Sequence, residues 1–162
     1  MVDADKITND AISKGGTLCL LYFDLHSSDK DNLTSLSTGF IDSIIKTQGV
    51  IYALGEINEP VETDKVFSTS IEVKVLVKDL LTLINLCSLF NPLNVEILRP
   101  NHFELSVQTI QDILMSVSAN WFGIKKTIAE KTSSTEDLER YKVYLENRIK
   151  VGRAILDKKD DK

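Results

Sequence analysis

The spacing of hydrophobic residues along the first two thirds of the chain switches between the two-residue period of strands and the three-to-four-residue period of helices. Residues 17–25 (TLCLLYFDL) are apolar on both alternating faces, which is typical of a central strand covered on both sides. Residues 50–57 indicate a second strand. Residues 66–77 (VFSTSIEVKVLV) indicate a third, whose alternation predicts one buried and one exposed face. Residues 95–98 predict a fourth strand, and residues 103–107 either prolong it or form a short strand of their own.

Two amphipathic segments separate these strands and are predicted to be helices. The first can be capped by Asp29 or Asp31 and stops near Gly49. The second follows Asp79 and is so apolar that it must be buried on most sides before an Asn-Pro pair ends it. The resulting order of strands and helices predicts an α+β fold, namely a ferredoxin-like βαββαβ sandwich with a four-stranded antiparallel sheet. Enzymes, RNA-binding proteins, ligand sensors and oligomerisation modules share this order, so it does not specify a function.

Two long helices are predicted to close the chain. Apolar residues recur at helical spacing between positions 108 and 131, and again along a second segment after a Thr-Ser-Ser break. Ser134 and Asp137 resemble a capping box at the start of that second segment. The two segments together predict a C-terminal helical hairpin. The expected parts are a flexible N-terminal arm at residues 1–16, a ferredoxin-like domain at residues 17–107, and a hairpin at residues 108–158 that packs on the domain or on a second subunit.

Composition narrows the class of protein. With 162 residues, of which 43% are hydrophobic, the chain suits one domain with a helical extension. Cys19 and Cys87 lie in apolar runs where a free thiol behaves as a small buried hydrophobe, and two cysteines do not resemble the disulfide framework of a secreted protein. The N-terminus lacks the apolar core of a signal peptide, and no apolar run approaches the roughly 20 residues of a membrane span. We therefore expect a cytoplasmic protein without membrane contact.

The net charge of −5 is unevenly distributed along the chain. Residues 1–105 hold 8 basic against 15 acidic side chains, a balance of −7, whereas residues 106–162 hold 11 against 9, a balance of +2. An acidic α/β body argues against broad binding of a polyanion over its surface. The candidate polyanion contacts are therefore on the C-terminal helices. They are Lys125, Lys126, Lys142 and Arg148, although the acidic residues interleaved with them are also typical of a solvated, salt-bridged helix surface.

A polar cluster follows the first predicted strand and is the candidate ligand pocket. In this cluster Asp24 would orient His26 as an acid or base, and the hydroxyls of Ser27 and Ser28 would bind an anion. The alternative is a solvated loop that caps the next helix. The sequence has no nucleophile elbow, phosphate-binding glycine loop or metal-ligand spacing, so no catalytic residue, metal or cofactor is predicted.

Trp121 and Phe122 are the candidate interface residues. Adjacent helical positions diverge by about 100°, so one of the two is expected to face a partner if both project from one helix. The sequence favours a non-catalytic homo-oligomeric interaction or scaffolding protein, with a second copy or another protein as partner. The first alternative is a nucleic-acid-associated protein that uses the basic side of the C-terminal helices. The second is a small-ligand sensor or unusual enzyme with its site at the end of strand one.

Overall fold

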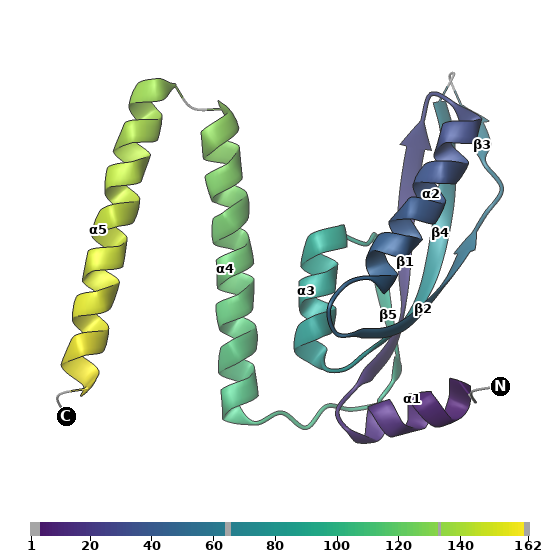
Figure 1. Ribbon diagram of the computed structural model, residues 1–162, viewed down its shortest axis with the longest axis horizontal. Helices are drawn as coiled ribbons and strands as arrows, with labels where there is room; N and C mark the ends of the chain where they lie inside the picture. The colour runs from purple at the N-terminus through teal and green to yellow at the C-terminus, as the bar shows by residue number, and fades with distance from the viewer. Residues whose placement is uncertain (1–3, 64–65, 133, 161–162) are drawn as a thin grey trace. The chain divides into compact units, whose positions relative to one another are not determined.

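A computed structural model describes residues 4–63, 66–132 and 134–160, without the side chains of residues 135, 138 and 152–160. The chain divides into two compact units, residues 1–117 and 118–162. Figure 1 labels its helices and strands. The elements of the first unit are α1 (Ala4–Ser13), β1 (Thr17–Ser27), α2 (Lys30–Ile45), β2 (Val50–Ile57), β3 (Val61–Thr63), β4 (Val66–Val77), α3 (Leu80–Phe90) and β5 (Asn94–Arg99). They are followed by α4 (Val107–Thr132), which runs into the second unit, and by α5 (Thr135–Asp160). The first unit is a mixed α+β fold.

The sheet is antiparallel, with the order β2-β4-β1-β5, and the short β3 pairs with the start of β4. The two predicted strands at residues 50–57 and 66–77 are confirmed with the same bounds. β1 runs two residues further than predicted, to Ser27, because it stays paired with β4 as far as Phe67. The predicted strand at residues 103–107 does not form, since α4 begins at Val107.

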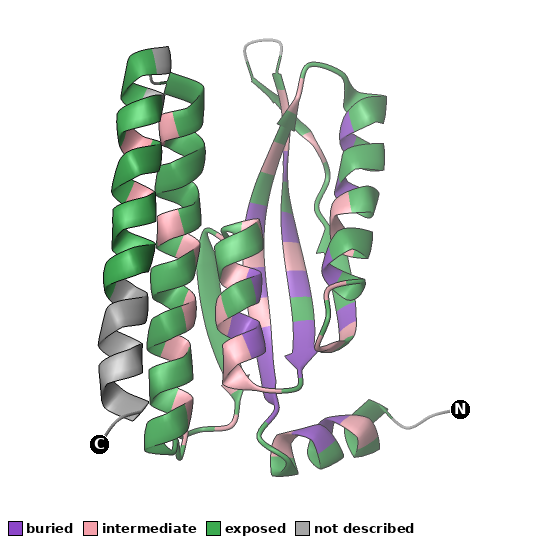
Figure 2. Ribbon diagram, turned by 60° about the vertical axis from the view of Figure 1, so that its left-hand side comes forward, coloured by how far each residue is buried: buried purple, intermediate pink, exposed green. Residues whose placement is uncertain are grey.

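Helices α2 and α3 cover one face of the sheet, and the main core lies between them and the strands (Figure 2). Both predicted caps are confirmed: the Asp29 side chain accepts a hydrogen bond from the backbone N–H of Asp31, and Asp79 accepts one from Thr82. Phe40 of α2 joins the layers, because its ring meets those of Phe23 and Phe90 edge-on. The buried members of this core are Cys19, Leu21, Phe23, Ile44, Ala53, Ile71, Val73, Val75, Val77, Leu83 and Leu86.

The opposite face of the sheet is covered by α1 at one end. This helix corrects the predicted flexible arm at residues 1–16, because residues 4–13 form a ten-residue helix; residues 1–3 lie outside the described residues. The Thr8 hydroxyl lies 3.0 Å from the hydroxyl of Tyr52, which ties α1 to β2. A second, smaller core consists of Ala11, Leu18 and Leu76, with Ile7, Ile12, Tyr52 and Leu98 packed against it. Within the first unit, β1 therefore has the predicted two-sided cover only at its start.

The long C-terminal helices α4 and α5 both begin at a serine cap, of which only the one at Ser134 was predicted. Ser106 Oγ accepts a hydrogen bond from the backbone N–H of Thr109 at 3.0 Å, and Ser134 Oγ accepts one from Asp137 at 3.3 Å. Ser133, in the predicted break, lies outside the described residues, as do the side chains of Leu138 and Ile155, two apolar residues of the predicted second helix. No residue of α4 is buried.

Candidate functional site

The predicted polar cluster at the end of β1 contains one contact between an imidazole and a carboxylate. His26 Nε2 lies 3.0 Å from Asp24 Oδ2, and both residues stand on the face of the sheet that α1 leaves open. The side chains are 58% and 40% exposed, so water screens the pair, and such a contact contributes at most about 1 kcal/mol. The orienting contact that the sequence predicted is present in the geometry, whereas acid or base chemistry at His26 stays a prediction.

Ser27 and Ser28 are separated from that pair. Because side chains alternate along a strand, Ser27 faces the side of the sheet opposite to His26. The Ser27 hydroxyl accepts hydrogen bonds from the Asp29 backbone N–H at 3.2 Å and from Asn32 Nδ2 at 3.4 Å, so it belongs to the start of α2. Ser28 is exposed in the turn. The structure therefore brings together two of the four predicted residues and places Ser27 where the capping alternative expects it.

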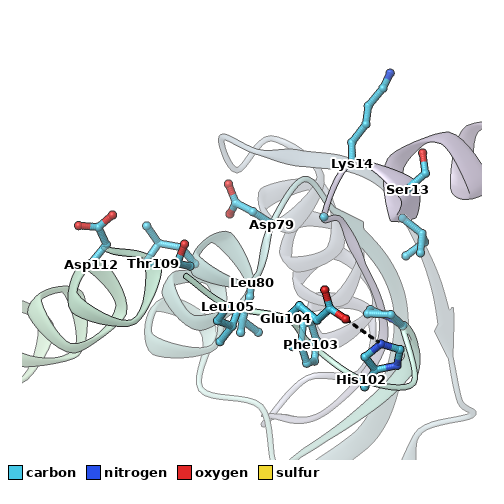
Figure 3. A pocket seen from close by; sticks show the side chains of 14 residues that line it. Ser13, Lys14, Asp79, Leu80, His102, Phe103, Glu104, Leu105, Thr109 and Asp112 are labelled. Carbon is cyan, nitrogen blue, oxygen red and sulfur yellow. Dashed lines mark ion pairs between the residues drawn. The ribbon is translucent and has the colours of Figure 1, made fainter. Parts of the chain in front are cut away.

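A pocket of about 680 Å³ in the first unit was not predicted (Figure 3). It lies between the end of α1, the start of α3 and the segment that links β5 to α4, which are too far apart in sequence for any local pattern to reveal it. Its charged lining side chains do not converge on one point in Figure 3, and His102 Nε2 lies 3.8 Å from Glu104 Oε1 with both side chains exposed. The charged lining residues are Lys14, Asp79, His102, Glu104 and Asp112.

Neither cysteine is prepared for nucleophilic chemistry. Cys19 and Cys87 are free thiols. Burial, with a smaller contribution from Cys87, raises the pKa of Cys19 to about 12, and burial also raises the pKa of Cys87. The thiolate is the reactive form, so both residues remain protonated thiols near neutral pH, Cys19 buried and Cys87 half-buried. In the part of the chain that the structure describes, no group of three or more His, Cys, Asp or Glu side chains is placed to hold a metal ion.

The part of the sheet that α1 leaves uncovered is acidic, and we call it the open sheet face. Tyr22 OH donates a hydrogen bond to Glu96 Oε2 at 3.2 Å. Desolvation, that hydrogen bond, and the charges of Glu96 and Glu72 raise the pKa of Tyr22. The open sheet face includes a hollow of about 400 Å³. We define the open sheet face by Leu20, Tyr22, Asp24 and His26 of β1, Leu54 and Glu56 of β2, Glu72 and Lys74 of β4, and Glu96 of β5.

Trp121 and Phe122 occupy different environments on α4. Phe122 is partly buried, and the Arg148 guanidinium of α5 lies 5.0 Å from the centroid of its ring. Trp121 is 57% exposed, with Lys125 Nζ 5.4 Å from its ring centroid. The expectation that adjacent positions diverge is met, and Trp121 is the member of the pair that remains available to a partner.

The four candidate polyanion contacts do not act as one free positive surface. Lys125 lies over Trp121, and Arg148 lies over Phe122. Lys126 Nζ is 3.9 Å from a carboxylate oxygen of Glu130. The fourth residue, Lys142, is exposed on α5. Three of the four cations therefore have contacts within the helices, and their binding of a nucleic acid stays a prediction.

The predicted apolar stripe of α4 is present and uncovered. At 100° per residue its members fall within an arc of about 100°. Leu114 is 63% exposed and none of the others is buried. We call this set the α4 stripe: Ile110, Ile113, Leu114, Val117, Trp121, Ile124 and Ile128.

Fold and surface together define an α+β protein with an antiparallel sheet and long C-terminal helices that expose apolar side chains. The chain belongs to the MJ0538 family, because the model of that family matches residues 18–150. The match begins in β1 and ends in α5, so it takes in the sheet, α2, α3, α4 and part of α5, whereas α1 lies before it. Comparisons with curated proteins and with solved structures found no match. No helix among the described residues is both long and apolar enough to cross a membrane.

Proposed function

We propose that this protein is a non-catalytic homo-oligomeric interaction module that associates through the α4 stripe. One observation carries the proposal: α4 has 26 residues and seven apolar side chains on one narrow face, yet none of its residues is buried. Full burial of such a side chain contributes about 1.5–3 kcal/mol. Covering the exposed halves of seven would contribute roughly 5–10 kcal/mol, which is large enough to offset much of the entropic cost of association.

The second unit supports the need for a partner. It has only the 45 residues from 118 to 162, and chains of this size rarely bury enough apolar surface to be stable alone. We propose that α4 and α5 pair as an antiparallel hairpin, supported by the contact of Arg148 with Phe122. Trp121 is one position away, so it projects about 100° from Phe122. Pairing with α5 on the Phe122 side leaves the α4 stripe free for a second copy.

We also propose that the first unit is a ferredoxin-like sandwich enlarged by β3. When β3 is set aside, the remaining strands have the order second, third, first, fourth, and all neighbours are antiparallel. Helices α2 and α3, the two crossover helices, share the main core on one face. These features support the βαββαβ arrangement. The free thiols of Cys19 and Cys87 support a reducing, cytoplasmic setting.

The solution mass tests the oligomer directly. We expect light scattering of the full chain to give a dimer or larger species that persists at high salt, because apolar burial is not screened by ions. Leu114→Lys should convert it to a monomer while the circular dichroism spectrum stays unchanged, since Leu114 is 63% exposed. Gln111→Lys is the matched control, because Gln111 is exposed on α4 outside the stripe. A wild-type monomer at every concentration, or a Leu114→Lys variant of unchanged mass, would contradict the proposal.

The two alternative functions have their own readouts. A nucleic-acid-associated protein would bind RNA or DNA with an affinity that falls steeply with salt and with loss of Lys142. A ligand sensor or enzyme with its site at the end of β1 would lose binding or activity in His26→Ala, while the fold is retained. If the protein forms an oligomer through α4, and shows neither salt-dependent nucleic-acid binding nor a loss of binding or activity in His26→Ala, the interaction module is the function that remains.

A further inference from the structure

We propose that the outer edge of β2 pairs with the same edge of a second copy of this chain, so that two sheets join across a two-fold axis. The proposed pairing is antiparallel and centred on Leu54, which lies opposite its own copy. The inference goes beyond the proposed function, because it adds a second contact on another surface, and this contact is weaker than the one proposed for the α4 stripe.

β2 is the last strand on its side of the sheet. The order of the strands is β2-β4-β1-β5, and among the described residues β2 pairs with β4 alone. The short β3 prolongs the row of β2 and does not cover it, because β1 occupies the other side of β4 from Phe67 to Val77 and β3 pairs with residues 66–68. Helix α1 reaches β2 from the face of the sheet, at the hydroxyl of Tyr52. The outer edge of β2 therefore has no strand beside it in the described part of the chain.

The hydrogen bonds of β2 fix which of its residues face outward. The backbone N–H of Asn58 donates to the carbonyl of Ser70 in β4 at 3.0 Å. The register of β2 with β4 continues without a shift over residues 52–57, and backbone groups alternate in direction along a strand. The even-numbered residues of β2 therefore bond to β4. The odd-numbered ones, Ala53 and Gly55 among them, direct their N–H and C=O groups to the free edge.

One register of two such edges satisfies both the backbone and the side chains. With Leu54 opposite its copy, Ala53 of each strand meets Gly55 of the other, and each pair exchanges both of its backbone hydrogen bonds. Leu54 is 63% exposed, and it meets Leu54 of the second copy across a non-hydrogen-bonded pair, where side chains approach most closely. The edge is thus complementary to itself, which favours a second copy as its partner.

The charge of Glu56 and the start of β2 favour this register over its neighbours. Glu56 already lies directly opposite Glu72 in β4, and like charges in that position repel each other. In the proposed register Glu56 falls beside Tyr52 of the second copy. A centre one residue later would place it beside Leu54, and a centre on Glu56 itself would oppose two carboxylates. A centre one residue earlier would need regular pairing at residues 50–52, where the register of β2 shifts.

The other edge of the sheet does not offer such a register. The carbonyl of Tyr22 accepts a hydrogen bond from the N–H of Leu93 at 2.8 Å, so the even-numbered residues of β1 face β5. By the register of that pair, Val95 and Ile97 then face outward. Pairing both with a second β5 would place Glu96 opposite its own copy. A charge at this position is a usual protection of an edge strand, whereas the centre of β2 is apolar.

The helical layer leaves room for the pairing. Helix α2 contacts β1 and β4 as well as β2, so its axis lies close to β4 and inward from the edge. Strands at about 4.8 Å spacing put β4 about 7 Å from the two-fold axis, so two α2 helices would be about 14 Å apart, which exceeds the roughly 8–10 Å at which helices pack.

The contact is smaller than the one proposed for the α4 stripe. It covers one leucine and a short run of backbone per strand, whereas the α4 stripe has seven apolar side chains. We therefore expect the edge to pair only at protein concentrations above those at which the α4 stripe associates. At such concentrations it joins α4-linked copies into larger assemblies.

Cross-linking tests position 54 directly. In Leu54→Cys the two introduced thiols face each other at the Cα separation of a non-hydrogen-bonded pair, about 4.5 Å, which a disulfide spans. Glu56→Cys is the matched control, because its thiols would lie roughly 13 Å apart along the strands. Both positions are exposed on the same face of β2. With oxidised glutathione as the oxidant, we expect Leu54→Cys to form a disulfide-linked dimer about tenfold faster or more. The wild type, with Cys19 and Cys87, gives the background rate.

Exchange of charge at the same position tests the register in solution. Leu54→Lys and Leu54→Glu each place like charges opposite each other, so light scattering should show each variant stopping at the mass of the α4-linked species. A one-to-one mixture of the two sets lysine opposite glutamate and should regain the larger assembly.

The outcomes separate this inference from the proposed function. Equal cross-linking at positions 54 and 56, or a larger assembly that Leu54→Lys leaves unchanged, would overturn the edge contact while the α4 oligomer stands. Preferential cross-linking at position 54 in a protein whose mass does not respond to Leu114→Lys would support the edge contact and overturn the α4 proposal.

Discussion

Replacing Gly55 with alanine should destabilise the fold, although the same change usually stabilises a strand. Gly55 lies on β2 where α2 crosses it, and a Cβ built there would be 2.4 Å from Ile41 Cδ1, 2.8 Å from Cγ1 and 3.0 Å from Cγ2. Ile41 cannot avoid the new methyl by a simple rotation, because β-branched side chains in helices hold one χ1 rotamer. Close approach of the helix to the strand therefore requires glycine at this position.

The magnitude follows from two opposing effects. Overpacking by one methyl group costs typically 1–3 kcal/mol in a close-packed core, and we take about 1–2 kcal/mol here because Gly55 is exposed and Ile41 only half-buried. Removing a glycine from a strand interior gains about 0.5–1 kcal/mol, because the unfolded chain loses conformational freedom. The net prediction for Gly55→Ala is a loss of about 0.5–1 kcal/mol in the free energy of unfolding. In an Ile41→Ala background the clashing atoms are gone, so the same substitution should become neutral or stabilising.

Urea unfolding followed by circular dichroism measures all four corners of this double-mutant cycle. Gly39→Ala is the matched control, since Gly39 is exposed in the middle of α2 with no atom within 4 Å of the added Cβ. It should stabilise the protein by about 0.5–1 kcal/mol. The reasoning fails if Gly55→Ala is as stable as the wild type, or if the cycle shows no coupling between residues 41 and 55.

Two further predictions concern a buried thiol and the attachment of α1. Because burial raises the pKa of Cys19 to about 12, stability should be full below about pH 9 and fall as the pH rises towards 12, by at most about 1.4 kcal/mol per unit. Urea midpoints at pH 8 and pH 10 should converge in Cys19→Ala, and an equal fall in both proteins would refute this. Tyr52→Phe should lower the free energy of unfolding by about 0.5–1.5 kcal/mol, because it removes the hydrogen bond between Tyr52 and Thr8. The Thr8 hydroxyl donates its proton to the carbonyl of Ala4, so in that bond Tyr52 donates and the Thr8 oxygen accepts. Faster amide exchange confined to α1 is the expected signature, and unchanged exchange there would show that α1 is held by packing alone.

The elements of the first unit were largely predictable because their signals are local. The alternation of β4, the caps at Asp29 and Asp79, and the turn at Gly49 each depend on residues within a few positions. The helix α1 was missed because its apolar residues are few and lie among charged ones, so its stability depends on packing against Leu18 and Leu76. β3 was missed for a similar reason, since three residues carry little pattern and pair only because β4 is nearby.

The candidate site was less predictable than the fold. The pairing of His26 with Asp24 could be predicted, because the two residues are two positions apart on a strand and therefore lie on the same face. The same periodicity excludes Ser27 from that face. The pocket beside His102 combines residues 12–15, 79–81 and 100–112, and the Glu56–Glu72 opposition depends on strand register. Neither feature leaves a signal in a single sequence read in short windows.

The contrast between α1 and α4 shows what hydrophobic periodicity can and cannot specify. α1 is short, with few apolar residues, yet Thr8 and Ala11 are buried because a sheet face lies beside them. α4 is much longer, with seven apolar residues on one narrow face, and buries none of them. A periodic pattern states that a face needs cover, whereas the identity of the cover depends on surfaces elsewhere. Large exposed apolar faces are uncommon on monomers, and this is the physical ground for the proposed second copy on the α4 stripe.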